Sequence, residues 1–193
     1  MLATDRRALL SVDVASIESE IGALAVAFCS DRACAASIGH ASAREAERRV
    51  FAAAQEALQS GRTLPLGDAV VLAPETLLAR LQGYAAGGED DFFDVPLLLG
   101  AMTPFQRRVV AACRAIPYGS TRTYGQIAAS VGSRGAARAV GQVMASNRIP
   151  LLVPCHRVVA SGGGLGGFSA PQGVDLKRRL LAMEARAAEL SCC

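Results

Sequence analysis

Two short helices joined by a tight turn set the architecture of the second half of this chain. Residues 123–126, Thr-Tyr-Gly-Gln, have the spacing of a capping box and predict that a helix begins at Tyr124. Gly132 is expected to end it, because glycine adopts the left-handed backbone of a helix C-terminus without strain. Ser133 is expected to cap the next helix at once, with its end near Ser146. The pattern predicts a helix-turn-helix.

The other signals predict a mixed first half and a mainly helical second half. Leu24, Val26 and Phe28 alternate as in a strand. Helices are predicted from a Ser-x-x-Glu box at residues 42–45 towards Ser60, from Pro74, from Thr103 and Pro104, and from about residue 174 to 189. The apolar residues 151–153 predict a short buried strand, which 158–159 continue.

Charge divides the chain in the same way. Residues 1–100 carry 8 Arg against 14 acidic residues, a balance of −6, whereas residues 101–193 carry 11 Arg and 1 Lys against 3 acidic residues, a balance of +9. A glycine-rich, then acidic segment at 85–91 separates the two regions and indicates a boundary. We expect an N-terminal α/β support domain, 1–95, and a C-terminal domain, 96–193. The basic half suits a polyanion, although ordinary surface charge is the alternative.

Composition restricts the class of protein. The chain of 193 residues has no apolar run near the roughly 18 residues of a membrane helix, and residues 1–7 do not resemble a secretion signal. We therefore expect a cytoplasmic protein without a membrane partner. Six cysteines occur without a Cys-x-x-Cys pair, so reduced thiols are expected. The glycine loop at 162–167 opens no helix, which argues against a nucleotide site, and no cofactor is expected.

The second helix of the predicted pair is unusual for a DNA-reading helix. One long cation, Arg138, stands among the small residues Ala136, Ala137, Ala139 and Gly141. A helix that reads bases from the major groove offers Arg, Asn or Gln side chains. This one predicts binding by shape with one inserted side chain, as in minor-groove recognition. A core helix packed through its alanines is the alternative.

Cys155 and His156 are adjacent, between Pro154 and Arg157. A thiol becomes a strong nucleophile as the thiolate, which needs a base or a cation nearby. Neighbouring side chains of a straight strand point to opposite faces, so contact needs an irregular backbone or a bridging water. Pro154 favours such a bend. No other metal ligands lie near Cys155 in the sequence.

A third group completes this candidate site. Glu184 lies on the inward face of the last helix, four residues after Leu180. A buried carboxylate is costly unless it is paired, and a histidine would satisfy it. A glutamate at the rim, paired with a surface arginine, is the alternative. Elsewhere, Cys29, Cys34 and His40 could supply three metal ligands, but a fourth is missing and buried cysteines are favoured, so no metal is expected.

Together these residues resemble the O6-alkylguanine-DNA alkyltransferase family. The similarity is dense from about residue 103 to 186. It includes Ile-Pro-Tyr-Gly at 116–119, Thr-Tyr-Gly-Gln-Ile-Ala at 123–128, Ala-Ala-Arg-Ala-Val-Gly at 136–141, Asn147, Pro-Cys-His-Arg-Val at 154–158, Gly-Gly-Phe-Ser at 166–169 and Leu-Leu-Ala-Met-Glu at 180–184. The first half is similar only loosely. The resemblance implies an α/β (α+β) fold with an RNase H-like first domain and a mostly helical second domain.

The resemblance also implies roles for individual residues. Cys155 takes the alkyl group from O6 of guanine in DNA, with O4 of thymine as an additional potential source, and is consumed. His156 accepts the thiol proton through a water, and Glu184 holds the imidazole. The implied supporting residues are Asn147 at the active-site turn, Tyr124, Pro150, Arg157, Val158 and Ser169 around the base, and Ala136, Ala137, Arg138, Ala139 and Gly141 on the DNA.

The expected partner is double-stranded alkylated DNA, bound by a monomer. Two other functions compete with this prediction. A damage-binding protein of the same fold is disfavoured, because such relatives lack the cysteine that this chain has at 155. A transcription regulator is disfavoured, because the helix around Arg138 has few base-reading side chains.

Overall fold

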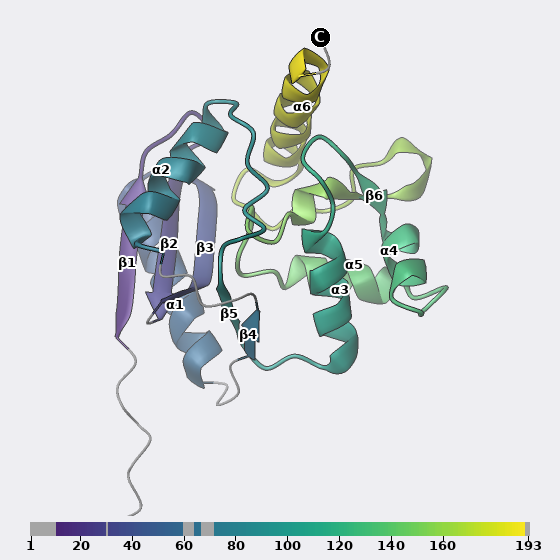
Figure 1. The fold of residues 1–193 in the computed structure, drawn as a ribbon, viewed down its shortest axis with the longest axis horizontal. Coiled ribbons are helices and arrows are strands. Elements are labelled where there is room, and N and C mark those ends of the chain that lie inside the picture. Colours follow the sequence, from purple (N-terminus) through teal and green to yellow (C-terminus); the bar gives the residue numbers. More distant parts are fainter. Residues whose placement is uncertain (1–10, 30, 60–63, 67–71, 192–193) are drawn as a thin grey trace, which may run out of the picture.

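The structure, a computed structural model, describes residues 11–29, 31–59, 64–66 and 72–191. A sheet with two helices forms the first part of the molecule, and a mainly helical part follows (Figure 1). The predicted α/β fold class is confirmed. None of the helices in the described part of the chain is both long and apolar enough to traverse a bilayer.

The sheet has five strands in the order β1-β2-β3-β5-β4. They are β1 (Val12–Ile17), β2 (Ala23–Cys29), β3 (Arg32–His40), β4 (Leu64–Leu66) and β5 (Leu97–Leu99). β3 and β5 are parallel, and the other neighbours are antiparallel. The sheet is therefore mixed, and its β5 strand comes from the chain that leads into the second half.

The alternation in β2 explains how both faces of the sheet are covered. Leu24, Val26 and Phe28 face α2 (Pro74–Ala85), whereas the alanines between them face α1 (Ala43–Gln59). All seven residues of β2 are buried, because side chains alternate between two covered faces. The predicted strand and both helix starts are confirmed; the predicted end near Ser60 lies outside the described residues.

In its described residues, the second half contains four α-helices and a two-stranded parallel sheet. The elements are α3 (Pro104–Arg114), β6 (Arg122–Thr123), α4 (Tyr124–Ser130), α5 (Ala137–Ala145), β7 (Val158–Val159) and α6 (Gly173–Ser191). Thr103 and Gln106 form a capping box at α3, and Thr123 and Gln126 form one at α4. The predicted starts of these helices, and the final helix, are therefore confirmed.

Two local predictions are wrong. α5 begins at Ala137 and not after Ser133, because the backbone of Ser133 closes a turn with the N–H of Ala136, 3.0 Å away. Residues 151–153 are buried but form a turn, in which Leu151 has a φ of 68°. An apolar run shows burial, but it does not distinguish a buried strand from a buried turn.

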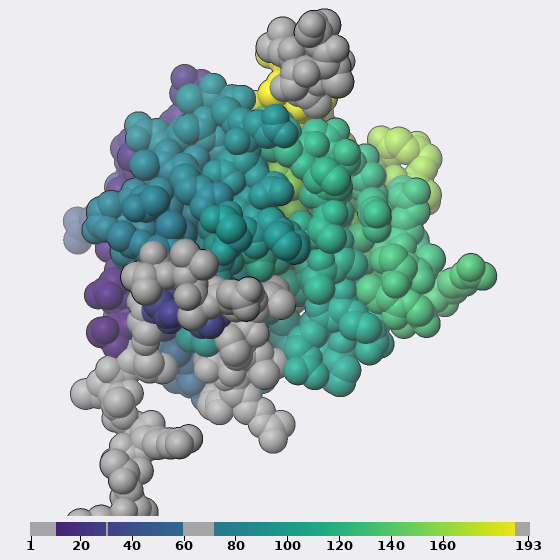
Figure 2. Space-filling model, viewed as in Figure 1, coloured from purple at the N-terminus to yellow at the C-terminus, as the bar shows by residue number. Residues whose placement is uncertain are grey.

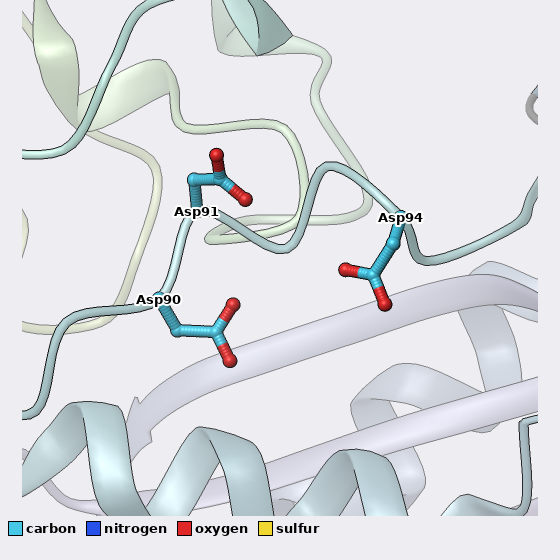
Figure 3. Close-up of side chains that lie close together, drawn as sticks. All are labelled: Asp90, Asp91 and Asp94. Carbon is cyan, nitrogen blue, oxygen red and sulfur yellow. The ribbon is translucent and has the colours of Figure 1, made fainter.

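The segment between α2 and β5 is held on both sides. Arg80 of α2 forms 2.7 Å ion pairs with Asp90 and with Asp94, and these carboxylates lie along the segment with Asp91 (Figure 3). From α3, the Arg114 guanidinium donates to the carbonyls of Phe92, Phe93 and Val95 over 2.9–3.0 Å. The segment that contains the predicted boundary is thus bound to a helix of each half.

The two halves share one apolar core. The larger buried cluster includes Leu24 and Leu81 from the first half and Val109, Ile127 and Leu176 from the second. In the space-filling view the two halves are in contact, with teal residues of the connecting region between them (Figure 2). The domain boundary between 95 and 96 stays a prediction; β5, which belongs to the sheet, lies just after it.

Candidate active site

An irregular backbone presents Cys155. After the turn at Leu151, the N–H of Cys155 donates to the carbonyl of Val153 over 2.7 Å, and residues Cys155–Arg157 form one 3-10 turn. This is the bend that Pro154 predicts. The turn lies inside the protein, with Cys155 4% exposed and His156 1% exposed. Successive side chains of the turn therefore reach different buried partners.

The Cys155 thiol is held by an amide. Asn147, just after α5, donates from Nδ2 to Sγ of Cys155 over 3.1 Å and to the carbonyl of Val153 over 2.9 Å. Its Oδ1 accepts from the N–H of Ile149 over 3.1 Å. Burial raises the pKa of Cys155, while the Asn147 hydrogen bond and the charge of Lys177 act to lower it. The thiol is thus protonated at rest, and reaction as a thiolate needs a base.

His156 is paired with Glu184, as the inward position of Glu184 on α6 predicts. Nε2 of His156 lies 2.9 Å from Oε1 of Glu184, and both residues are buried. A neutral imidazole must donate from Nε2 to this carboxylate, so Nδ1 carries the free lone pair. Nδ1 has no hydrogen-bond partner among the residues that the structure describes. Burial lowers the pKa of His156, which favours the neutral form.

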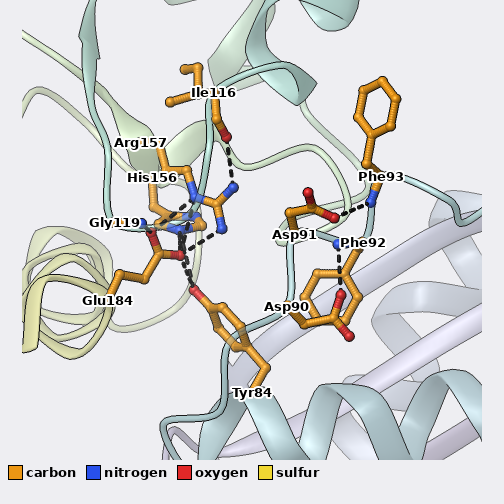
Figure 4. Close-up of polar contacts among 10 residues, drawn as sticks. All are labelled: Tyr84, Asp90, Asp91, Phe92, Phe93, Ile116, Gly119, His156, Arg157 and Glu184. Carbon is orange, nitrogen blue, oxygen red and sulfur yellow. Dashed lines mark hydrogen bonds and ion pairs between the residues drawn. The ribbon is translucent and has the colours of Figure 1, made fainter. Parts of the chain in front are cut away.

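The Glu184 carboxylate is the centre of a larger network (Figure 4). Arg157 donates to it from Nε and Nη2, the N–H of Gly119 donates over 3.1 Å, and the Tyr84 hydroxyl donates over 2.6 Å. Burial acts to raise the pKa of Glu184, but His156 and Arg157 outweigh it and hold the pKa at about 2. Glu184 is therefore ionised, and the alternative of a rim glutamate is excluded.

A cavity of about 960 Å³ joins the sulfur to the helix-turn-helix. Its lining includes six residues that the sequence assigns to the site: Tyr124, Ala137, Arg138, Gly141, Cys155 and Ser169. Arg138 is exposed, and the turn before α5 gives this face its position. A base held in this cavity would lie between α4, α5 and the segment around Ser169.

Other predicted site residues lie outside this lining. Arg157 points away from the cavity, towards Glu184 and the carbonyl of Ile116, because the 3-10 turn directs it into the core. Val158 is buried in β7, and its carbonyl accepts from Lys177 over 2.6 Å. Pro150 lines a neighbouring cavity of about 530 Å³ that shares Ser169. Ala136 precedes α5, and Ala139 is half-buried on it.

Sequence reasoning missed two residues of the site. Lys177 is buried on α6 and lies seven residues, or two helical turns, before Glu184. The two residues therefore lie on the same face of the helix, and this spacing is the sequence signal that could have identified Lys177. Tyr84 comes from α2, 100 residues before Glu184. No local pattern connects these two, because the contact exists only after the halves pack together.

The possible metal ligands do not converge. Cys29 and Cys34 have their sulfurs 3.0 Å apart, whereas His40 faces Glu45 at 3.4 Å. In the described part of the chain, the residues close enough to share an ion are Asp90, Asp91 and Asp94. Arg80 already neutralises two of these carboxylates.

Comparisons with known proteins agree with the geometry. The family model "6-O-methylguanine DNA methyltransferase, DNA binding domain" matches residues 104–186. A methylated-DNA–protein-cysteine methyltransferase of Mycolicibacterium paratuberculosis is 49% identical over 107 residues, 55% of this chain and 62% of that protein. The constitutive enzyme of Bacillus subtilis is 45% identical over 54% of this chain and 62% of its own length. The chain thus aligns with somewhat under two thirds of these curated relatives.

Solved structures extend the similarity to both halves. The Mycobacterium tuberculosis O6-methylguanine methyltransferase is 34% identical, with a TM-score of 0.67, over 92% of this chain and 94% of that one. The same organism's OGT, in complex with DNA, is 32% identical with a TM-score of 0.66, over 90% and 93% of the two chains. This protein therefore has the two-part fold of the DNA alkyltransferases. It belongs to the O6-methylguanine-DNA methyltransferase family.

Proposed function

We propose that this protein repairs DNA by direct reversal, transferring the alkyl group from O6 of guanine to Sγ of Cys155. The observation that carries the proposal is that Cys155 lines the cavity next to α5 and is followed in its 3-10 turn by His156, which is paired with the buried Glu184. The names and the DNA complex of the relatives support the same reaction.

The buried groups account for activation of the thiol. The Cys155 proton passes through a water to Nδ1 of His156, and Glu184 stabilises the imidazolium that forms. Asn147 donates to the developing thiolate. The sulfur then forms a bond to the alkyl carbon, and the carbon–O6 bond breaks with its electron pair going to guanine. The base leaves with a negative charge, and the proton that His156 took from the thiol returns through water to the base, so that neutral guanine and a neutral imidazole remain.

The reaction consumes the protein. The product is a thioether at Cys155, and a thioether is a poor leaving group, so no step restores the thiol. Each molecule transfers one alkyl group, whether from O6 of guanine or, as a second source, O4 of thymine. The activity is therefore that of a single-turnover methylated-DNA–protein-cysteine methyltransferase.

Access to the base requires flipping, because the target atom is stacked inside the duplex. The small residues Ala136, Ala137, Ala139 and Gly141 allow α5 to approach the minor groove closely. Arg138, exposed beside the cavity, fills the gap that the base leaves. In our proposal Tyr124 and Ser169 contact the extruded guanine, and Val158 and Pro150 form the outer wall of its pocket. Arg157 donates hydrogen bonds to Glu184.

The proposed partner is double-stranded DNA that carries an alkylated base. The balance of +9 over residues 101–193 favours a polyanion. A monomer is sufficient for this reaction, because all the proposed groups come from one chain. The cytoplasm remains the expected compartment.

The decisive experiment is methyl transfer to a single cysteine. The protein is incubated with a duplex oligonucleotide containing one O6-methylguanine and then digested for mass spectrometry. We expect one methyl group on the peptide that contains Cys155, at no more than one per protein, with unmodified guanine restored. Cys155→Ala is the matched control, since it removes the sulfur and keeps Cβ.

Each competing function has its own outcome. Tight binding to the lesion without transfer by the unsubstituted protein would indicate a damage-binding protein. Binding to one undamaged sequence, with no preference for the lesion, would indicate a transcription regulator. Methylation of Cys29, Cys34 or Cys113 instead of Cys155 would contradict the assigned nucleophile.

A further inference from the structure

We propose that Tyr84 is a positioning residue of the proton relay: its hydroxyl holds the Glu184 carboxylate against His156 and keeps the imidazole neutral in the resting protein. This inference rests on the proposed function and deepens it, because it gives the first half of the chain a part in activating Cys155.

The contact is short and buried. Tyr84 is 1% exposed, and its hydroxyl lies 2.6 Å from Oε1 of Glu184 and 3.3 Å from Nε2 of His156 (Figure 4). Oε1 is also the oxygen that His156 contacts at 2.9 Å. Because Nε2 uses its proton on Oε1, it has no lone pair to offer, and the tyrosine proton must also point to Oε1.

The tyrosine ring is fixed by its neighbours. The ring centroids of Tyr84 and Phe92 are 5.5 Å apart, and Tyr118 packs edge-on at 5.9 Å. Arg80, one turn before Tyr84, lies 5.4 Å from the centroid of Phe92 and is bound to the acidic residues of the same segment. The hydroxyl is therefore placed by α2 and the connecting segment together.

The charges around His156 give this hydroxyl its effect. The groups that face or border the imidazole are Glu184 and Lys177 of α6, Cys155 and Arg157 of its own turn, and Tyr84 of α2. Tyr118, after α3, lies near Glu184 and Arg157. Glu184 favours the imidazolium, whereas Arg157 and Lys177 oppose it. A hydroxyl that donates to Oε1 stabilises the negative charge there and weakens its pull on the imidazolium. Nδ1 then stays free to accept the thiol proton.

The test uses two tyrosine variants and the small number of histidines. Tyr84→Phe removes the hydroxyl and keeps the ring. Tyr118→Phe is the matched control, because its hydroxyl is buried without a hydrogen-bond partner in the described part of the chain. The chain has two histidines, so nitrogen NMR of labelled histidine follows His156 with His40 as an internal reference.

We expect Tyr84→Phe to raise the pKa of His156 by about one unit, because the carboxylate charge then acts on the imidazolium alone. Tyr118→Phe should leave that pKa unchanged. As the pH is lowered, the rate of single-turnover methyl transfer should begin to fall at a higher pH in Tyr84→Phe than in the parent protein. At alkaline pH, where His156 is neutral in both, the rates should agree within about threefold.

A folded Tyr84→Phe protein with an unchanged His156 pKa would overturn the proposal, even if its thermal stability fell. A second measurement needs no variant. In the parent protein the Tyr84 hydroxyl proton should be protected from exchange and show a cross-peak to the His156 ring, and its absence also contradicts the proposal. Both NMR measurements need no DNA, so a failure of methyl transfer would leave their result readable by itself.

Discussion

Glu184 is the residue on which buried polar groups of both halves converge. An isolated buried carboxylate is very costly, and several charge-assisted hydrogen bonds offset that cost here. His156, Arg157, Tyr84 and the N–H of Gly119 all contact its two oxygens. The same carboxylate therefore serves the stability of the fold and the orientation of the imidazole.

Glu184→Gln should destabilise the protein strongly at neutral pH. The folded-state pKa of about 2 lies below the unfolded value near 4.5, so this carboxylate stabilises the fold above pH ~4.5 and loses that contribution as the pH falls through about 2. The shift corresponds to on the order of 3 kcal/mol at pH 7.

Urea unfolding of both proteins at pH 7 and near pH 2 measures this effect. The gap in unfolding free energy between the parent protein and Glu184→Gln should shrink at acid pH. Asp175→Asn is the matched control, since Asp175 is an exposed acidic residue of the same helix paired with Arg178. An equal difference in unfolding free energy at both pH values would contradict the lowered pKa of Glu184.

Single site residues can be predicted from the sequence where a short local pattern contains them. Cys155 and His156 are adjacent, and Glu184 lies on a helical stripe with Leu180, so the three were found together. The family resemblance implies that Arg157 lies around the base, but the 3-10 turn directs its side chain into the core. Tyr84 has no local signal at all, because its partner is 100 residues away.

Among the elements, the connection between α4 and α5 decides how the small-residue face of α5 is presented. Gly132 has a φ of 73°, and a Cβ built on it would meet nothing within 4 Å. Any effect of a substitution there comes from the backbone conformation and not from a clash. Gly125, inside α4, has an ordinary helical backbone and is the natural comparison.

Gly132→Ala should lower the free energy of unfolding by about 1 kcal/mol, because alanine is strained at this φ. Gly125→Ala should leave stability unchanged or raise it by up to about 1 kcal/mol, since alanine favours a helix. Denaturant titration of the two variants checks the pair. A loss in Gly125→Ala as large as that in Gly132→Ala would show that crowding, not backbone strain, governs this region.

Capping residues made most helix starts predictable. Thr103 and Thr123 each pair with a glutamine three residues later, and both boxes form. Ser133 misled the prediction, because a serine backbone can also close a turn, and here it delays α5 to Ala137. The strand predicted at 151–153 failed for a related reason: burial alone does not determine backbone direction.

At the scale of the whole molecule, charge and composition predict an acidic first domain and a basic second domain, and the boundary between them stays a prediction. The larger apolar cluster contains residues of both halves, and a tyrosine of the first half contacts the buried network of the second. Composition describes what each segment contains, whereas the docking of segments depends on three-dimensional complementarity. The charge asymmetry remains informative about the partner, because surface charge acts at long range.

The three hydrogen bonds of Arg114 have a consequence for proteolysis. Phe93 is 59% exposed in a glycine-rich, acidic region, which is the composition of a cleavable linker. A protease needs several residues freed from their hydrogen bonds, and Arg114 binds the carbonyls on both sides of this site.

The native protein should therefore resist chymotrypsin at Phe93. Arg114→Met should speed that cut by about tenfold or more, since each bond from a charged donor contributes about 1.5–3 kcal/mol. Arg107→Met, an exposed change on the same helix, is the control, and mass spectrometry of the fragments locates the cut. Equal cleavage in both variants would contradict this role. The segment around Phe93, which has the composition of a linker, is therefore expected to protect the connection between the two halves from cleavage.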